Sequence, residues 1–184
     1  MTHAMAVPGA SAVSPPESTW DADTALTNLY AAHWRQLVRL SVLLVRDVAT
    51  AEEIVQDAFV AVHDRWSRLR DPDKALAYLR QAVVNRSRSA LRHRTVVARH
   101  AARESVQPNG APADAPVLAA ARRAAVLDAM RSLPERQREV LALRYYLDLS
   151  EAEIAEALGI SRGAVKTHNS RGLHSLRTAM EVNR

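Results

Sequence analysis

The sequence contains no cysteine and no long apolar run, and each absence excludes a kind of site or a class of protein. Without cysteine there are no disulfides and no cysteine-ligated metal site, which is compatible with a reducing cytosol. No apolar run approaches the roughly 18 to 20 residues that a membrane-spanning helix needs. The N-terminus also lacks the charged and apolar regions of a signal peptide. We therefore expect a cytoplasmic protein, in which residues 1–20, rich in Pro, Ser and Ala, form a disordered leader.

Motifs typical of enzymes are absent as well. The chain has no phosphate-binding Walker loop, no nucleophile elbow and no dinucleotide fingerprint. Its seven histidines are scattered, and His93 and His100 have no third ligand at a metal-binding spacing. We therefore expect no enzymatic activity, no catalytic residue, no metal, no cofactor and no small-molecule substrate.

The charge balance points to an anionic partner. The 184 residues carry a formal net charge of +5 at pH 7. Lys74 and Lys166 are the only lysines, so most of the positive charge comes from arginine, whose planar guanidinium makes paired bonds to phosphate and guanine.

Helical periodicity predicts an all-α chain with two domains. Apolar residues recur at helical spacing from Leu26 to Leu44 and on two further segments, which together make a helical bundle over residues 21–100. Residues 101–116 contain three prolines and an Asn-Gly pair without a periodic apolar face, so they read as a flexible linker. Residues 117–184 form the second domain.

The second domain contains the most informative segment, a predicted helix-turn-helix from Leu149 to Arg177. Ser150 and Glu153 make a capping box that starts the first helix. Gly159 stands where a helix end often needs a left-handed residue, and Ser161 can cap the second helix. A second helix of this kind fits the major groove of duplex DNA.

The predicted second helix separates into an apolar and a polar side. The residues expected to face inward are Val165, Leu173 and Leu176. Those expected to face outward have side chains that bond phosphates and base edges: Arg162, Lys166, Thr167, His168, Asn169 and Arg171. An ordinary helical hairpin with a solvated basic face is the plain alternative.

Arginines also gather at the end of the third helix of the first domain. Arg88, Arg92 and Arg99 approximate one face, a positive stripe that a phosphate backbone can follow, or else a solvated surface. Trp66 and Tyr78 lie nearby in sequence and can offer stacking surfaces for bases, although a core position is the simpler reading of Trp66.

Acidic residues mark the second helix of the same domain. Glu52, Glu53 and Asp57 share an exposed side with Gln56, and no pocket residues accompany them. This pattern favours a protein-docking or solvated face over acid–base catalysis.

Two separated stretches resemble one family, the extracytoplasmic-function sigma factors, a branch of the sigma-70 family. Similarity to region 2 of that family lies in DVATAEEIVQDAFVAVHDRW and AYLRQAVVNRSRSALRHR. Similarity to region 4 lies in LPERQREVLALRYYLDLSEAEIAEALGISRGAVKTHNSRGLHSLR. Response regulators also contain a helix-turn-helix of this type but lack the paired region 2 segments. Asn169 departs from the family, which often has an apolar residue there.

The resemblance implies a sigma factor, which binds core RNA polymerase, directs it to specific promoters and promotes DNA melting. Region 2 would be a helical bundle that docks on the coiled coil of the largest polymerase subunit through Glu53, Gln56 and Asp57. Region 4 would be the helix-turn-helix domain and would also contact the flap of the second-largest subunit. An anti-sigma factor is a further expected partner.

The resemblance also assigns DNA contacts by position. Region 2 would capture the −10 element as a melted strand, with residues 67–73 as its specificity loop and with Asn85, Arg86, Arg88 and Arg92 along the strand. Region 4 would read the −35 element as duplex through Arg162, Lys166, Thr167, His168 and Arg171. Two alternatives stay open at this point: a stand-alone helix-turn-helix regulator, which normally needs a dimer helix, and a nucleic-acid-processing enzyme, which needs a catalytic constellation.

Overall fold

A computed structural model describes residues 18–69, 71–100 and 117–182, and every regular element in these ranges is a helix. The order along the chain is α1 Ser18–Val45, α2 Val48–His63, η1 Trp66–Arg68, η2 Pro72–Lys74, α3 Ala75–His100, α4 Val117–Ser132, α5 Glu135–Leu141, η3 Ala142–Tyr146, α6 Glu151–Leu158 and α7 Arg162–Val182. The elements η1 and η2 are 3₁₀ turns, and η3 is a π-helical turn. The predicted leader and linker fall outside the described residues, except for the first residues of α1.

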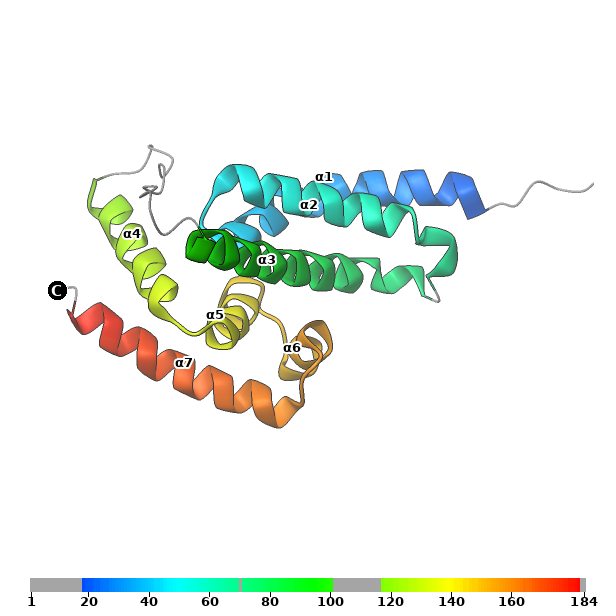
Figure 1. Cartoon of the computed structure of the whole chain (residues 1–184). Helices are drawn as coiled ribbons and strands as arrows, with labels where there is room; N and C mark the ends of the chain where they lie inside the picture. The colour runs from blue at the N-terminus through cyan, green and yellow to red at the C-terminus, as the bar shows by residue number, and fades with distance from the viewer. Residues whose placement is uncertain (1–17, 70, 101–116, 183–184) are drawn as a thin grey trace, which may run out of the picture.

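The first domain is a bundle of α1, α2 and α3, which run side by side in Figure 1. Its core is formed by fully buried aliphatic side chains, including Leu37, Val55 and Leu79. Burying one such side chain contributes about 1.5 to 3 kcal/mol. A hydrogen bond of 3.1 Å between the buried hydroxyls of Ser41 and Ser87 pairs the polar groups that this core encloses.

The reversal between α1 and α2 is built from two adjacent residues. Arg46 has a φ of 71°, an uncommon left-handed conformation for a non-glycine residue, and it ends α1. Asp47 then caps α2, because its carboxylate accepts a hydrogen bond of 2.7 Å from the Thr50 amide. This bond holds the pKa of Asp47 below its ordinary value.

The second domain is formed by α4 to α7, with α7 packed on α5, α6 and α4 (Figure 1). Val140, Leu143, Ile154 and Val165 are fully buried in it. α7 comes very close to α5 at Gly172, where an added Cβ would stand 3.1 Å from Leu141 Cγ. A residue without a side chain is therefore what lets α7 lie against α5.

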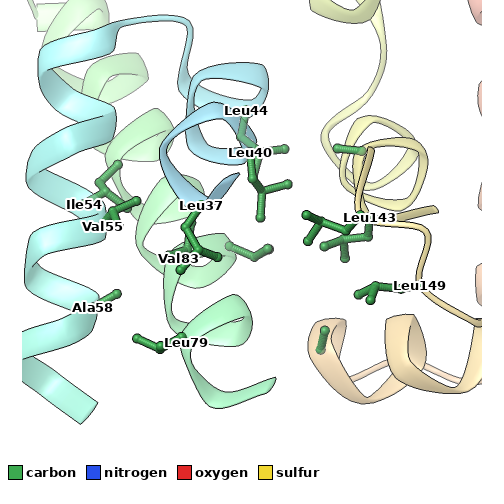
Figure 2. Close-up of a cluster of buried hydrophobic side chains, with 14 of the residues drawn as sticks. Leu37, Leu40, Leu44, Ile54, Val55, Ala58, Leu79, Val83, Leu143 and Leu149 are labelled. Carbon is green, nitrogen blue, oxygen red and sulfur yellow. The ribbon is translucent and has the colours of Figure 1, made fainter. Parts of the chain in front are cut away.

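The two domains pack directly against each other. α3 contacts α6, and α1 contacts η3. Figure 2 shows Leu143 and Leu149 on the side of the second domain that faces Leu40 and Leu44 of α1. Because these side chains belong to a single buried cluster, the described residues share one continuous core.

Two sequence predictions about element ends need correction. The apolar periodicity predicts a second helix from Ala49 to about Trp66, but the helix ends at His63, and Trp66 lies in a 3₁₀ turn with its ring buried. The sequence also predicts one helix that starts at Leu133-Pro134-Glu135 and continues to Leu147, but the chain is α-helical only to Leu141 and then widens into the π-helical turn η3. Periodicity locates helices well but does not register such local changes of hydrogen-bond pattern.

Candidate nucleic-acid interface

The helix-turn-helix of α6 and α7 is stabilised at each of its junctions. Glu153 N donates to Ser150 Oγ at 3.3 Å while Ser150 N donates to Glu153 Oε2 at 2.8 Å, so the predicted capping box is confirmed. Gly159 ends α6 with a φ of 63°, and Ser161 Oγ accepts from the Ala164 amide at 3.1 Å at the start of α7. These local bonds fix the angle at which α7 leaves the turn.

The cap also changes the acidity of Glu153. Hydrogen bonds from the Ser150 side chain and backbone lower the pKa of the Glu153 carboxyl, with a smaller contribution from the positive charge of Arg80. The cap is therefore strongest with Glu153 ionised.

The exposed side of α7 carries the polar residues that the sequence assigned to duplex DNA. Arg162, Lys166, Thr167 and Arg171 are exposed, and His168 is half-buried. Val165 is buried on the inward side of α7, and Lys166, Thr167 and Arg171 lie about 100° or more away from it around the helix, whereas Arg162 and His168 lie nearer to it, at about 60°. Lys166 Nζ lies 3.7 Å from Glu151 Oε2, and Thr167 Oγ1 donates to the Gly163 carbonyl at 3.0 Å. We call Arg162, Lys166, Thr167, His168 and Arg171 the α7 surface.

Two other predictions about α7 are wrong. Leu173, expected to face inward, is 39% exposed. Asn169, expected to face outward, has its Oδ1 buried with no hydrogen-bond partner among the described residues. A helix turns by about 100° per residue, so the inward stripe through Val165, Gly172 and Leu176 includes Asn169 and leaves Leu173 at its edge. The seven-residue spacing of Val165 and Gly172 was the signal that could have shown this.

All four residues assigned to the −10 strand lie on α3, but they differ in exposure and in the element that they contact. Asn85 is exposed, and its Oδ1 accepts a hydrogen bond of 3.3 Å from Arg88 Nη1. Arg86 Nη2 donates to the Asp57 carbonyl at 3.2 Å, which ties α3 to α2. Arg92 is exposed about two turns beyond Asn85 along α3.

Arg88 does not lie on an exposed positive stripe, contrary to the sequence prediction. Its side chain is only 14% exposed and forms an ion pair with Glu139 of α5. Nε and Nη2 donate to the two carboxylate oxygens at 2.9 Å each, and Glu135 Oε1 also lies 2.9 Å from Nε. Burial lowers the pKa of Arg88, but its bonds and charge interactions with Glu139 and Glu135 outweigh burial and raise that pKa above its ordinary value. Arg99, the last member of the predicted stripe, has a side chain outside the described residues.

Arg94 has a role that the sequence did not reveal. Its Nη1 donates to the Val45 carbonyl at 3.1 Å and its Nη2 donates to Thr50 Oγ1 at 2.8 Å. Nη2 also lies 3.8 Å from Asp47 Oδ1. Arg94 therefore stabilises the turn between α1 and α2, although it belongs to the same basic segment of α3 as the residues proposed to bind DNA.

The outer side of α2 has the acidic character expected of it. Glu53, Gln56 and Asp57 are exposed, while Ile54 and Val55 are buried on the opposite side. We call Glu53, Gln56 and Asp57 the α2 surface.

Exposed apolar groups lie near the α2 surface and were missed. Val60, one turn after Asp57, is 54% exposed, and Tyr30 of α1 is 47% exposed. The Tyr30 ring stacks on Trp34 at a centroid distance of 4.7 Å and meets the edge of Phe59 at 5.3 Å. Tyr30 belongs to the apolar periodicity of α1, yet it is half exposed and presents an aromatic group next to Phe59 of α2.

Neither a metal cluster nor a membrane-crossing helix occurs in the described part of the chain. Within it, no three His, Asp or Glu side chains gather as a metal site would need. None of its helices combines the length and apolarity needed to cross a bilayer.

Comparison with known proteins agrees with this arrangement. The family Sigma-70 region 2 matches residues 29–96, and the family Sigma-70, region 4 matches residues 123–176. The RNA polymerase sigma-E factor of Streptomyces antibioticus is 35% identical over 150 residues, which cover 79% of this chain and 79% of that one. The ECF RNA polymerase sigma factor SigL of Mycobacterium tuberculosis is 32% identical over 161 residues, which cover 83% and 87% of the two chains.

A solved structure shares the fold. The sigma factor RpoE in its co-crystal structure with the anti-sigma factor NepR from Bartonella quintana superposes with a TM-score of 0.67 at 22% identity. The match covers 89% of this chain and 99% of that one. From its two family matches and its similarity to these sigma factors, the chain belongs to the sigma-70 family, in the extracytoplasmic-function group of RNA polymerase sigma factors.

Proposed function

We propose that this chain binds core RNA polymerase, directs it to specific promoters and promotes the opening of promoter DNA. One observation supports this most strongly. The same chain presents a helix-turn-helix with a largely exposed polar α7 surface and, in a separate domain, an acidic α2 surface beside a basic helix. A stand-alone repressor needs only the first of these features.

The α7 surface is proposed to read the −35 element as duplex. Arginine and lysine bond guanine edges and phosphates, and the threonine methyl can contact thymine. Because the Thr167 hydroxyl already bonds the Gly163 carbonyl, its methyl group is the part offered to a base.

The basic end of α3 is proposed to hold the −10 element as a melted strand. Asn85, Arg86, Arg88 and Arg92 supply amide and guanidinium donors within about two turns of one helix. Residues 67–73 precede that helix and are proposed as the specificity loop. Unstacking each base costs a few kcal/mol, and contacts to the captured strand offset part of this cost.

The α2 surface is proposed to dock on the coiled coil of the largest polymerase subunit, and the second domain on the flap of the second-largest subunit. Exposed carboxylates, with the exposed Val60 one turn after Asp57, suit a partner that has basic side chains beside an apolar group. Polymerase and chromosome share the cytoplasm, so we place this chain there, acting without catalytic activity of its own.

We divide the chain into a leader (1–20), region 2 (21–100), a linker (101–116) and region 4 (117–184). An anti-sigma factor is proposed as a further partner. The solved complex of the Bartonella quintana sigma factor with the anti-sigma factor NepR supports this proposal, since the two sigma chains share a fold.

In vitro transcription tests the proposal. Purified core polymerase, the full chain and a library of duplex promoter sequences should yield RNA from a subset of templates that share two sequence elements at a fixed spacing. Binding to palindromic duplex as a dimer, with no start sites conferred on the polymerase, would instead identify a stand-alone regulator.

A further inference from the structure

An ion pair links the two helices of the helix-turn-helix at a residue of the α7 surface. Glu151 is the first residue of α6, and Lys166 lies one turn after the start of α7. Glu151 Oε2 is 3.7 Å from Lys166 Nζ, and the two side chains are 34% and 68% exposed. Because Lys166 is the only lysine of the α7 surface, this carboxylate acts on the one ammonium group that the surface offers to DNA.

The start of α6 does not need Glu151 as a cap. Ser150 and Glu153 already satisfy each other's backbone amides there. At 3.7 Å the charges of Glu151 and Lys166 attract each other without a hydrogen bond, and an ion pair this exposed contributes little to folding stability. The main effect of the Glu151 carboxylate therefore falls on the position and the electrostatic surroundings of the Lys166 ammonium.

The arginines of the α7 surface have no such neighbour. Among the described residues, Lys166 forms an ion pair, whereas Arg162 and Arg171 form none. Both guanidinium groups can therefore bind phosphates or base edges without first leaving a carboxylate. Lys166 instead meets DNA with a negative charge already beside it.

A fixed carboxylate distinguishes between the two kinds of DNA group that lysine binds. An ammonium donates either to the O6 and N7 acceptors of guanine, which are neutral, or to a phosphate, which is an anion. A phosphate oxygen that approaches Lys166 also approaches Glu151 and is repelled by it. A guanine edge carries no net charge, and an ammonium has three donors, enough for a base and a nearby carboxylate at once. Glu151 therefore favours guanine over phosphate as the partner of Lys166.

We propose that Glu151 is a positioning residue for reading of the −35 element, and that it keeps Lys166 on a guanine edge and away from the phosphate backbone. This proposal rests on the proposed function of the α7 surface. It goes further by assigning one base type to Lys166 and by placing the control of that contact on α6, outside the α7 surface. Phosphates are the same in every sequence, so a lysine held on phosphate adds affinity without adding specificity.

Base preference provides the first test. Competition binding with single-base variants of the −35 duplex measures it, with the full chain bound to core polymerase. Lys166→Met should lose at least about fivefold of the discrimination at one guanine, the lower limit for a good base contact. Glu151→Gln should lower the preference at that same guanine by about twofold, as expected if half of the ammonium groups move to phosphate. Glu181→Gln, which removes an exposed carboxylate at the far end of α7, should leave it unchanged.

Glu151→Asp separates positioning of Lys166 from a general effect of charge on the helix. Aspartate keeps the negative charge at the start of α6, where it interacts favourably with the helix dipole, but its side chain is shorter. Thermal unfolding of this variant should therefore match that of the parent. A carboxylate that only stabilises α6 would leave the base preference of Glu151→Asp intact, whereas positioning of Lys166 predicts that the preference falls.

Neutral substitutes for single phosphates locate the ammonium directly. In a set of −35 duplexes that each carry one methylphosphonate, Glu151→Gln should lose affinity at a site near the guanine where the parent loses none. The double variant Glu151→Gln with Lys166→Met should not respond at that site, because the ammonium is gone. The slope of log affinity against log salt should steepen by about 0.9 in Glu151→Gln, as for one added phosphate contact, but not in the double variant.

The possible results separate this proposal from the function on which it rests. An unchanged base preference in Glu151→Gln would overturn the positioning role. A loss of preference caused by Glu151→Gln in the Lys166→Met chain as well would mean that Glu151 contacts a base itself, which also overturns it. Either result leaves duplex reading by the α7 surface intact. If the parent prefers no −35 sequence over another, the proposed function of that surface fails instead.

Discussion

Single residues at the start of α6 determine how the DNA-reading helix is presented. Ser150 and Glu153 satisfy one another's backbone amides, and Gly159 supplies the left-handed end of the same helix. These residues do not belong to the α7 surface, but they set the angle at which α7 leaves the turn. Their effect is therefore on stability first and on DNA affinity only through geometry.

We predict that Ser150→Ala lowers the free energy of unfolding of the chain by about 1 kcal/mol, the usual value of such a cap. Denaturant unfolding followed by circular dichroism measures this. Ser170→Ala, an exposed serine in α7, should change it little. Equal stability of Ser150→Ala and the parent would show that the cap contributes nothing.

The same cap should lose strength in acid. The folded pKa of Glu153 is lowered from its ordinary value of 4.5. A carboxyl with a lowered pKa contributes stability that is present above its unfolded pKa and is lost as pH falls through the folded pKa. The difference between the parent and Ser150→Ala should be full at pH 7 and shrink below about pH 4. A difference that is constant down to the pH of acid unfolding would contradict this.

A second prediction at this scale concerns base reading. Arg171→Ala should weaken binding to the −35 duplex by about 1 to 3 kcal/mol and relax sequence preference at one position. Arg177→Ala, an exposed arginine of the same helix outside the α7 surface, should leave that preference unchanged. Competition binding with single-base variants of the duplex is the measurement, and an unaltered preference in Arg171→Ala would remove Arg171 from the reading surface.

Among the elements, α2 shows how one helix serves two purposes. Its inner side, with Ile54, Val55 and Ala58, holds the bundle together (Figure 2), and its outer side carries the α2 surface. Arg86 of α3 bonds the Asp57 carbonyl, so the backbone of the proposed polymerase helix directly supports the proposed DNA helix. The two proposed surfaces therefore lie on helices that are hydrogen-bonded to each other.

Charge reversal on this element should affect assembly without affecting folding. We predict that Asp57→Arg weakens binding of core polymerase by at least about tenfold, or about 1.4 kcal/mol, because it places a positive charge against a basic partner. Thermal unfolding should be unchanged, since the Asp57 side chain is exposed. Glu181→Arg makes the same charge change on the exposed end of α7 and should bind normally. Equal polymerase affinity for both variants would exclude the α2 surface.

For the whole molecule, sequence prediction succeeded where the determining signals are local. The helical class, the capping box, the turn at Gly159 and the Ser161 cap each depend on residues within one or two turns, and all are confirmed. The family followed from two motifs in a fixed order, and the comparisons confirm it. The roles assigned to individual site residues stay predictions.

Prediction failed where a residue's surroundings come from distant parts of the chain. Arg88 has the spacing of an exposed helix position, and its partner Glu139 stands 51 residues later in another domain. No periodicity within α3 reveals that contact. Leu173 and Asn169 were misplaced for a different reason, because the seven-residue spacing of Val165 and Gly172, which marks the inward side of α7, is a local signal that the prediction did not use.

By the proposed function, this chain both positions core polymerase on duplex promoter DNA and promotes opening of that duplex. Run-off transcription with core polymerase on three templates tests this most directly: a selected duplex promoter, the same promoter with a scrambled −35 element, and one with a pre-opened −10 segment. We predict specific RNA from the duplex, loss of it on scrambling, and a smaller defect of Arg88→Gln on the pre-opened template than on the duplex. RNA no greater than that from core polymerase alone, on the duplex and on the pre-opened template alike, would contradict the claim.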